Sequence, residues 1–261
     1  MIYINSIGSS IPETIISNKD LEDLKIGLNL KELEEQTGIK ERRTSLPLKY
    51  IKETKNSDVR EAPKNWIKSP TDLGVEAVHI ALKNAGINVE DIGLVIGDSS
   101  SPIETTPSEG QRVAGRLGLK VPTYDLLTPG IAFSAHLKTL LTWKTEKLPK
   151  YVLCVTANAP TMSIDYSKSP SMCCFGDGAA AMIVSAEDKR GFEVRDAVAN
   201  FTPKSGKDLI IHNLKHLDFD LNAALKNSAD SLRLMIKEGI KKNSLKHSSL
   251  KIITGNFDTI T

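Results

Sequence analysis

The sequence predicts an α/β fold in which short apolar strands alternate with helices, so that most strands run parallel. Six runs are short, apolar and rich in β-branched residues, as strands covered on both faces tend to be; they are residues 2–7, 92–97, 123–127, 151–156, 179–185 and 250–254. Helical patterns lie between and after them, at residues 71–85, 108–117, 132–143 and 222–242. Strands that alternate with helices require crossover connections, and such connections place strands in parallel.

Capping residues set the expected ends of these helices. Ser17 precedes a segment that carries Leu21 and Leu24 on one side, as an N-cap does. Helix 71–85 ends at Gly86, and helix 108–117 follows Pro107 and ends at Gly118. The polar stretch 44–69 contains prolines, and we interpret it as a surface insertion.

Composition excludes several classes of protein. The 261 residues carry 34 Lys and Arg against 32 Asp and Glu, a net charge of +2 that favours no nucleic-acid partner. Three cysteines, two of them adjacent, cannot form a disulfide framework, which indicates a reducing compartment. No apolar run approaches the ~18 residues of a membrane span, and the N-terminus reads as a strand rather than a signal peptide. We therefore expect a cytoplasmic protein that needs no cofactor or metal.

Four segments occur in an order and at intervals that resemble one known family. Residues 37–43 read TGIKERR, and residues 85–96 join a helix end at AGI to a strand. Residues 107–125 run from Pro-Ser through Leu-Gly to Tyr-Asp, and residues 175–181 read FGDGAAA. Together they resemble β-ketoacyl-acyl-carrier-protein synthase III (ketosynthase III) of the thiolase-fold superfamily, with its T-G-I-x-x-R-R and F-G-D-G-A-G-A elements.

The resemblance implies a thiolase-like fold of two related halves, whose mixed, mainly parallel sheets sandwich central helices in α-β-α-β-α layers. The halves would be residues 1–186 and 187–261, the second one incomplete, with dimerisation through the first. Phe175, Gly176, Asp177 and Gly178 would form a structural element beneath the active site. Small residues around Asp177 favour this interpretation, because they let two backbones approach closely while the carboxylate fixes a turn.

The nucleophile position departs from the family. Residues 124–133 match the F-D-x7-F frame without gaps, and the cysteine position of that frame falls on Gly130. Thr128 and Ser134 are hydroxyls nearby, although the sequence shows no base beside either one, and an unactivated hydroxyl is a poor nucleophile. Cys154 lies within a strand pattern and reads as core.

Other family positions differ too. The histidine that follows a strand in the second half corresponds to Gly255, and the family's catalytic asparagine would fall after residue 261. At the coenzyme A contacts, Glu32, Gln36 and Ser169 replace an aromatic residue and two arginines, with Lys168 beside the last. Thr37 is retained as a substrate-binding candidate. The resemblance therefore implies weakened coenzyme A binding.

Three functions are compatible with a chain that keeps the framework motifs of the family but has other residues at its catalytic and coenzyme A positions. The first is a non-catalytic partner subunit, inactive alone, that supports an active ketosynthase III homologue in fatty-acid, polyketide or related acyl-condensation biosynthesis. Its partners would be that homologue in a heterodimer, or a second copy through the N-terminal half, and an acyl carrier protein. The second is an acyltransferase or condensing enzyme of the synthase III type with a rearranged active site. The third is a binding module for an acyl chain or a carrier protein.

Overall fold

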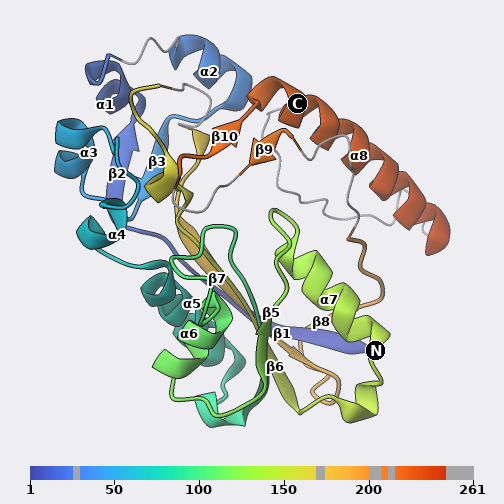
Figure 1. The fold of residues 1–261 in the computed structure, drawn as a ribbon. Helices are drawn as coiled ribbons and strands as arrows, with labels where there is room; N and C mark the ends of the chain where they lie inside the picture. Colours follow the sequence, from blue (N-terminus) through green and yellow to red (C-terminus); the bar gives the residue numbers. More distant parts are fainter. Residues whose placement is uncertain (26–29, 169–173, 200–206, 211–214, 245–261) are drawn as a thin grey trace.

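The computed structural model describes residues 1–25, 30–168, 174–199, 207–210 and 215–244, and its centre is a six-stranded sheet (Figure 1). The strand order is β5 (Thr123–Asp125), β4 (Ile92–Asp98), β6 (Tyr151–Asn158), β7 (Gly178–Ser185), β1 (Ile2–Ser10) and β8 (Phe192–Val194). β4 pairs in parallel with β5 and β6, whereas β7 is antiparallel to β6 and β1, and β8 is antiparallel to β1. β5, β4, β6 and β1 thus share one direction, which confirms the predicted α/β class.

The apolar runs of the sequence become the buried strands of this sheet. β6 is the clearest case, since its first five residues are all buried, as expected of a strand covered on both faces. Five of the six predicted strands are confirmed within a few residues of their expected ends. The sixth, at residues 250–254, lies outside the described residues.

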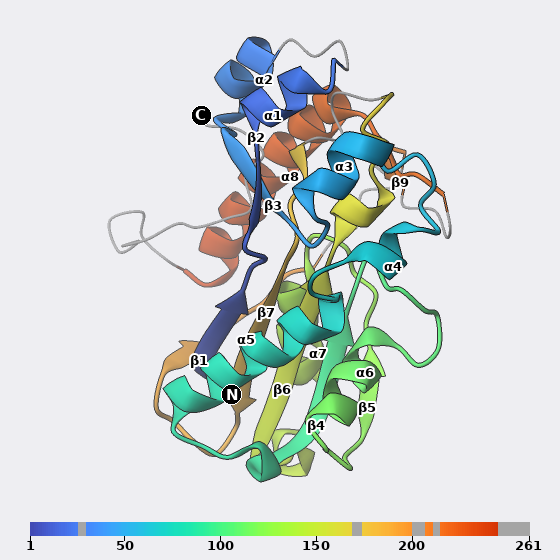
Figure 2. The ribbon, with the colours of Figure 1, turned by 90° about the vertical axis from the view of Figure 1, so that its left-hand side faces the viewer.

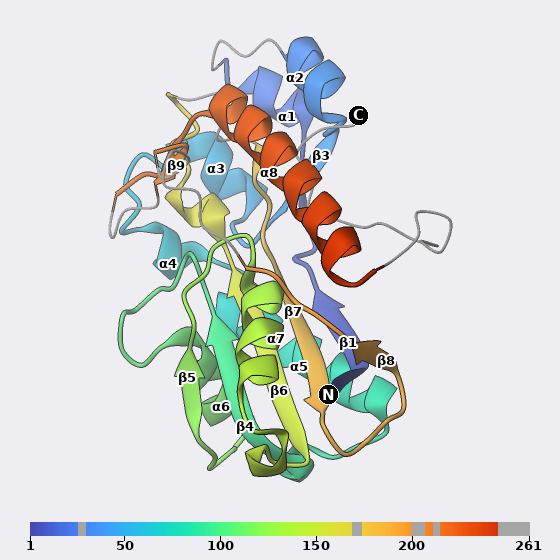
Figure 3. The same cartoon turned by 90° about the vertical axis from the view of Figure 1, so that its right-hand side faces the viewer.

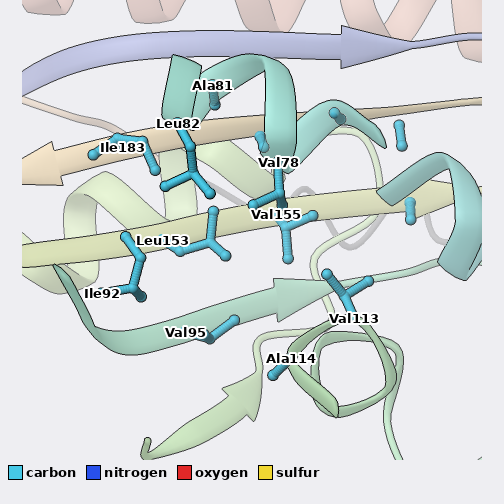
Figure 4. Packing of buried hydrophobic residues seen from close by; sticks show 14 of the residues in the cluster. Val78, Ala81, Leu82, Ile92, Val95, Val113, Ala114, Leu153, Val155 and Ile183 are labelled. Atoms are coloured by element: carbon cyan, nitrogen blue, oxygen red, sulfur yellow. The ribbon is translucent and has the colours of Figure 1, made fainter. Parts of the chain in front are cut away.

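One face of the sheet is covered by α5 (Pro70–Ala85) and α6 (Glu109–Arg116), as Figure 2 shows. α5 begins in a capping box at Ser69 and ends at Gly86 in the left-handed conformation, which confirms both predicted ends. Its apolar side packs on the strands, and Figure 4 shows Val78 of α5 next to Val155 of β6 and Leu82 next to Leu153. 3-10 turn η1 (Val89–Asp91) joins α5 to β4.

The opposite face of the sheet is covered by α7 (Ala132–Thr142), which lies across it in Figure 3. The buried residues of this second cluster are Ile2, Leu94, Ile96, Leu140, Val152, Cys154, Met182, Val184 and Val194. α7 is followed by the 3-10 turn η2 (Thr145–Lys147), which leads into β6. The central sheet is therefore enclosed by helices on both sides.

A smaller unit sits above the C-terminal end of β4 and β6, around the antiparallel pair of β2 (Thr14–Ser17) and β3 (Glu41–Thr44) (Figures 1 and 2). Its helices are α1 (Asn18–Asp23), α2 (Leu30–Thr37), α3 (Leu48–Thr54) and α4 (Ala62–Asn65), and η3 (Pro160–Ser163) packs against them. The interpretation of residues 44–69 as a surface insertion was wrong in part. Leu46, Ile51 and Ala62 have 0% exposure, because they pack with Met162 and Ile164 in one apolar cluster.

The C-terminal part adds β9 (Leu209–Ile210), β10 (Asp218–Phe219) and α8 (Leu221–Lys242), the long helix that the sequence predicts. Asp220 caps α8 by accepting a hydrogen bond from the Ala223 N–H. At the other end of α8, Lys242 forms an ion pair of 2.8 Å with Asp196. β8 lies beyond residue 186 and pairs with β1, and the division into halves at 186 and 187 stays a prediction.

Candidate active site at the turn before α7

The turn between β5 and α7 holds the position at which the resemblance places a nucleophile. Gly130 lies there, exposed, with φ of +77°, a left-handed conformation that glycine adopts without the penalty of a side chain. A Cβ added to Gly130 would meet nothing within 4 Å. The turn closes through a hydrogen bond of 3.1 Å from the Ile131 N–H to the Thr128 carbonyl. The site therefore has room for a side chain that the sequence does not supply.

The turn is attached to the sheet through the carboxylate of Asp98, the last residue of β4. Asp98 is 2% exposed, and its Oδ2 accepts the Thr128 N–H at 2.7 Å and the Thr128 hydroxyl at 3.5 Å. Burial raises the pKa of the Asp98 carboxyl, and the hydrogen bonds from Thr128 and Thr156 oppose this increase. The structure thus places beside Thr128 a carboxylate that the local sequence does not indicate.

A row of polar side chains continues from Asp98 along the end of the sheet. The Thr156 hydroxyl donates to Asp98 Oδ1 at 3.3 Å, and it accepts from the Asn158 Nδ2 at 2.9 Å. Asn158 Oδ1 in turn accepts from the N–H and the hydroxyl of Ser100, at 2.7 and 2.8 Å. These bonds fix the orientation of Asp98 from the side opposite to the turn.

The first turn of α7 carries no side-chain cap and no acidic residue. Its first N–H groups and the positive end of the helix dipole thus face the Gly130 turn without a neutralising carboxylate on the helix itself. Leu127 and Ile131, on either side of Gly130, are 66% and 37% exposed. Ser134, the other candidate hydroxyl, lies exposed on the first turn of α7. The turn thus combines an electropositive helix end with an apolar rim.

Behind the turn, Asp125 of β5 ties α6 to the sheet. Its carboxylate accepts the Ser108 hydroxyl at 2.8 Å and the Gly110 N–H at 3.0 and 3.1 Å. Glycine is required at Gly97 and Gly110, because a Cβ at either position would lie 2.4 Å from Asp125 Oδ1. Glu109 lies in this layer too, with its Oε1 2.5 Å from the Thr71 hydroxyl.

The segment Phe175–Gly178 forms a buried junction with Asp177 at its centre. The Asp177 carboxylate accepts the Ser45 N–H at 2.6 Å, and it accepts the N–H and the hydroxyl of Thr161 at 3.0 and 2.6 Å. The Asp177 N–H donates to the Arg43 carbonyl at 2.8 Å. Burial raises the pKa of Asp177 to about 6, against these hydrogen bonds. The segment joins β3, η3 and β7, as a structural element would.

Two other nucleophilic or basic side chains near the site are deeply buried. His136 of α7 has 0% exposure, and within the described structure neither ring nitrogen finds a hydrogen-bond partner of good geometry. Burial lowers the pKa of His136 to about 4, against a small effect of the Gly97 backbone, so the ring is neutral at pH 7. Cys154 also has 0% exposure, and burial raises the pKa of its thiol. Cys154 is therefore a core residue, as the strand pattern indicates.

The remaining predicted site residues lie apart from the turn or outside the described residues. Thr37, at the end of α2, donates its hydroxyl to the Leu33 carbonyl at 2.7 Å. Lys168 is an exposed partner of Asp165, with Nζ 3.1 Å from Oδ2. Gly255 and Ser169 lie outside the described residues. The roles assigned to Thr37, Lys168, Gly130 and Gly255 stay predictions.

Comparison with known proteins supports the resemblance. The family 3-Oxoacyl-[acyl-carrier-protein (ACP)] synthase III matches residues 131–201. The Beta-ketoacyl-[acyl-carrier-protein] synthase III of Sulfurovum sp. is 27% identical over 258 residues, which cover 92% of this chain and 70% of that protein. The protein of the same name from Aliarcobacter butzleri is 31% identical over 200 residues, 75% of this chain and 54% of that protein. This chain is a ketosynthase III-like protein.

The fold of this ketosynthase III-like chain agrees with that family. It superposes on the crystal structure of the Thermus thermophilus Beta-Keroacyl-[Acyl Carrier Protein] Synthase III with a TM-score of 0.77 at 24% identity, over 95% of this chain and 74% of that one. The thiolase-like fold predicted from the four motifs is thereby confirmed. Among the helices of the described residues, none has both the length and the apolar character to cross a membrane.

Proposed function

We propose that this ketosynthase III-like chain transfers acyl groups held as thioesters, as a condensing-type acyltransferase with a rearranged active site. The relatives it matches bear the name Beta-ketoacyl-[acyl-carrier-protein] synthase III, a name that refers to an acyl group on a carrier protein. The observation that carries the proposal is the architecture around Gly130. The turn is exposed, it lies at an uncapped helix N-terminus, and a buried carboxylate supports it.

Each part of this arrangement serves acyl transfer. An uncapped helix N-terminus stabilises the negative charge that forms on a thioester carbonyl oxygen during attack. The exposed Leu127 and Ile131 offer apolar surface to the acyl chain. The open space at Gly130 leaves room for a thioester carbonyl at the turn.

Intact-protein mass spectrometry tests the proposal. The chain is incubated with acyl-coenzyme A donors of several chain lengths and, separately, with acyl-acyl-carrier protein. A mass increase equal to the acyl group is expected with at least one donor. If every donor leaves the mass of the chain unchanged and no acyl group reaches an added acceptor, the acyltransferase function is wrong.

A second function, a non-catalytic partner of an active ketosynthase III homologue, is favoured by Gly130 itself. No side chain stands at the nucleophile position, and Cys154 is buried with a raised thiol pKa. β5, a three-residue strand before the Gly130 turn, is an edge strand of the sheet within the described residues, and we place the partner subunit along that edge. Co-expression with an intact homologue should then yield a heterodimer, whereas a lone homodimer with condensing activity would contradict this function.

A further inference from the structure

We propose that the Thr128 hydroxyl, held beside the Asp98 carboxylate, accepts the acyl group of the thioester in place of a cysteine. The inference rests on the proposed acyl-transfer function and names the residues that carry it. Thr128 lies two residues before Gly130, on the same exposed turn. It is half-buried, and its neighbours Leu127, Pro129 and Gly130 are exposed. The hydroxyl thus lies close to the surface at which a thioester would arrive.

The backbone fixes this hydroxyl next to its base. Oδ2 of Asp98 accepts the Thr128 N–H at 2.7 Å, and the same oxygen lies 3.5 Å from Thr128 Oγ1. The short backbone bond holds the hydroxyl over the carboxylate, while the Leu126 carbonyl at 3.2 Å is its other acceptor. Contacts between a nucleophile and its base are often long without substrate and tighten in the complex.

Asp98 has the properties of a general base. It is 2% exposed, burial raises the pKa of its carboxyl, and the nearby charge of Asp125 acts in the same direction. A carboxylate withdrawn from water binds a proton more readily than a solvated one, and it is in this way that an alcohol nucleophile is activated. Thr156 and Asn158 hold the carboxylate in place from the far side.

The proposed step balances without a further reagent. Thr128 Oγ1 attacks the thioester carbonyl carbon and forms a carbon–oxygen bond, while its proton passes to Asp98. The N–H groups at the start of α7 stabilise the oxyanion of the tetrahedral intermediate. The carbon–sulfur bond then breaks, and Asp98 returns the proton to the departing thiolate. The products are a threonine ester and a free thiol.

Peptide mapping of the acylated chain locates the adduct. Trypsin is expected to release residues 121–138, between Lys120 and Lys138, and this peptide contains no cysteine. We expect the acyl mass on this peptide, at Thr128 on fragmentation, resistant to neutral hydroxylamine and released at alkaline pH as an oxygen ester. An adduct that neutral hydroxylamine removes, or one on a cysteine-containing peptide, would overturn the assignment.

Matched variants distinguish the role of Thr128 as the nucleophile from that of Asp98 as the base. Thr128→Val keeps the shape and abolishes acylation, Thr128→Ser retains it, and Asp98→Asn slows it by at least ~100-fold, the usual contribution of a general base. The rate with Asp98→Asn should also lose the rise with pH that titration of a carboxyl gives to the wild-type rate. Thr142→Ala, which removes an exposed threonine hydroxyl at the far end of α7, leaves the acylation rate unchanged.

The outcomes distinguish this inference from the proposed function. If the wild-type chain is acylated and Thr128→Val is acylated equally fast, acyl transfer stands and the role of Thr128 is overturned. If Ser134→Ala rather than Thr128→Val removes the adduct, the nucleophile is Ser134. If the wild-type chain forms no adduct with any donor, the acyltransferase function itself is wrong. Circular dichroism and an unfolding curve for Thr128→Val show that this silent variant is folded, and the activity retained by Thr128→Ser shows that the loss comes from the hydroxyl.

Discussion

Replacement of Asp177 by asparagine tests whether the junction around this residue holds the fold together. The carboxylate receives three hydrogen bonds, from the Ser45 N–H and from the N–H and hydroxyl of Thr161. These donors come from segments 132 and 16 residues away in sequence. Asparagine has the same shape but carries only one acceptor oxygen. In either orientation, its NH₂ group therefore faces a buried donor.

The stability lost in Asp177→Asn can be worked out from these three hydrogen bonds. The better orientation keeps the amide oxygen on Ser45 and the Thr161 hydroxyl, and it turns the NH₂ toward the Thr161 N–H. One buried N–H then lacks an acceptor, which costs about 1–3 kcal/mol, and the bonds that remain lose their charge assistance. Part of this loss of stability is offset, because burial disfavours the ionised form of the Asp177 carboxylate and the variant no longer has to bury that charge. We expect the free energy of unfolding to fall by about 2–3 kcal/mol.

Urea unfolding followed by far-UV circular dichroism measures this loss at pH 7. The matched control is Glu90→Gln, the same chemical change at an exposed position on η1, for which a change within about 0.5 kcal/mol is expected. A loss for Asp177→Asn no larger than that of the control would refute the view that Asp177 is the structural centre of the motif.

Three further predictions concern the Gly130 turn and the layer beneath it. Burial lowers the pKa of His136 from 6.5 to about 4, so the neutral ring contributes its full stability above pH 6.5, and this contribution is lost as the pH falls toward 4. The free energies of unfolding of wild type and His136→Leu, measured in urea, should therefore diverge by about 3 kcal/mol across that pH window. Gly97→Ala should destabilise the fold by more than about 1 kcal/mol in thermal unfolding, because its Cβ would meet Asp125 Oδ1 at 2.4 Å; an unchanged Tm would contradict this. Gly130→Cys should fold at a cost of only about 1–2 kcal/mol for its left-handed φ of +77°, and iodoacetamide should alkylate the new thiol faster than the native cysteines.

The central sheet was predictable because its buried strands consist of consecutive apolar residues. β6 reads as an unbroken apolar run since both of its faces are covered, and helix α5 has a clear cap at Ser69 and a clear stop at Gly86. The small unit over the sheet was not predictable in the same way. Its buried residues, such as Leu46 and Ile51, are isolated within polar segments. Tertiary contacts within the cluster that also contains Met162 of η3 make them core residues.

The position of the candidate site could be predicted from the sequence, but the set of side chains that surround it could not. The motif frame located the turn at Gly130, yet it gave no indication that Asp98 lies beneath it. The signal was present in the strand pattern. Asp98 follows the predicted strand 92–97 and Thr128 follows the predicted strand 123–127, and the carboxyl ends of neighbouring parallel strands meet at one edge of a sheet. Pairing of β4 with β5 was needed to bring the two residues together.

Two buried carboxylates in this fold, Asp177 and Asp98, differ in where their hydrogen-bond donors lie. Asp177 binds two backbone N–H groups and the hydroxyl of Thr161, which has 0% exposure, so no proton there can reach a substrate. Asp98 is as deeply buried, yet one of its donors is the hydroxyl of Thr128 on an exposed turn. Burial raises the pKa of both carboxyl groups, but of the two only Asp98 contacts a hydroxyl on an exposed turn, that of Thr128. A single network thus holds the turn and connects it to a base, and for this reason the absence of a side chain at Gly130 does not by itself make the site inert.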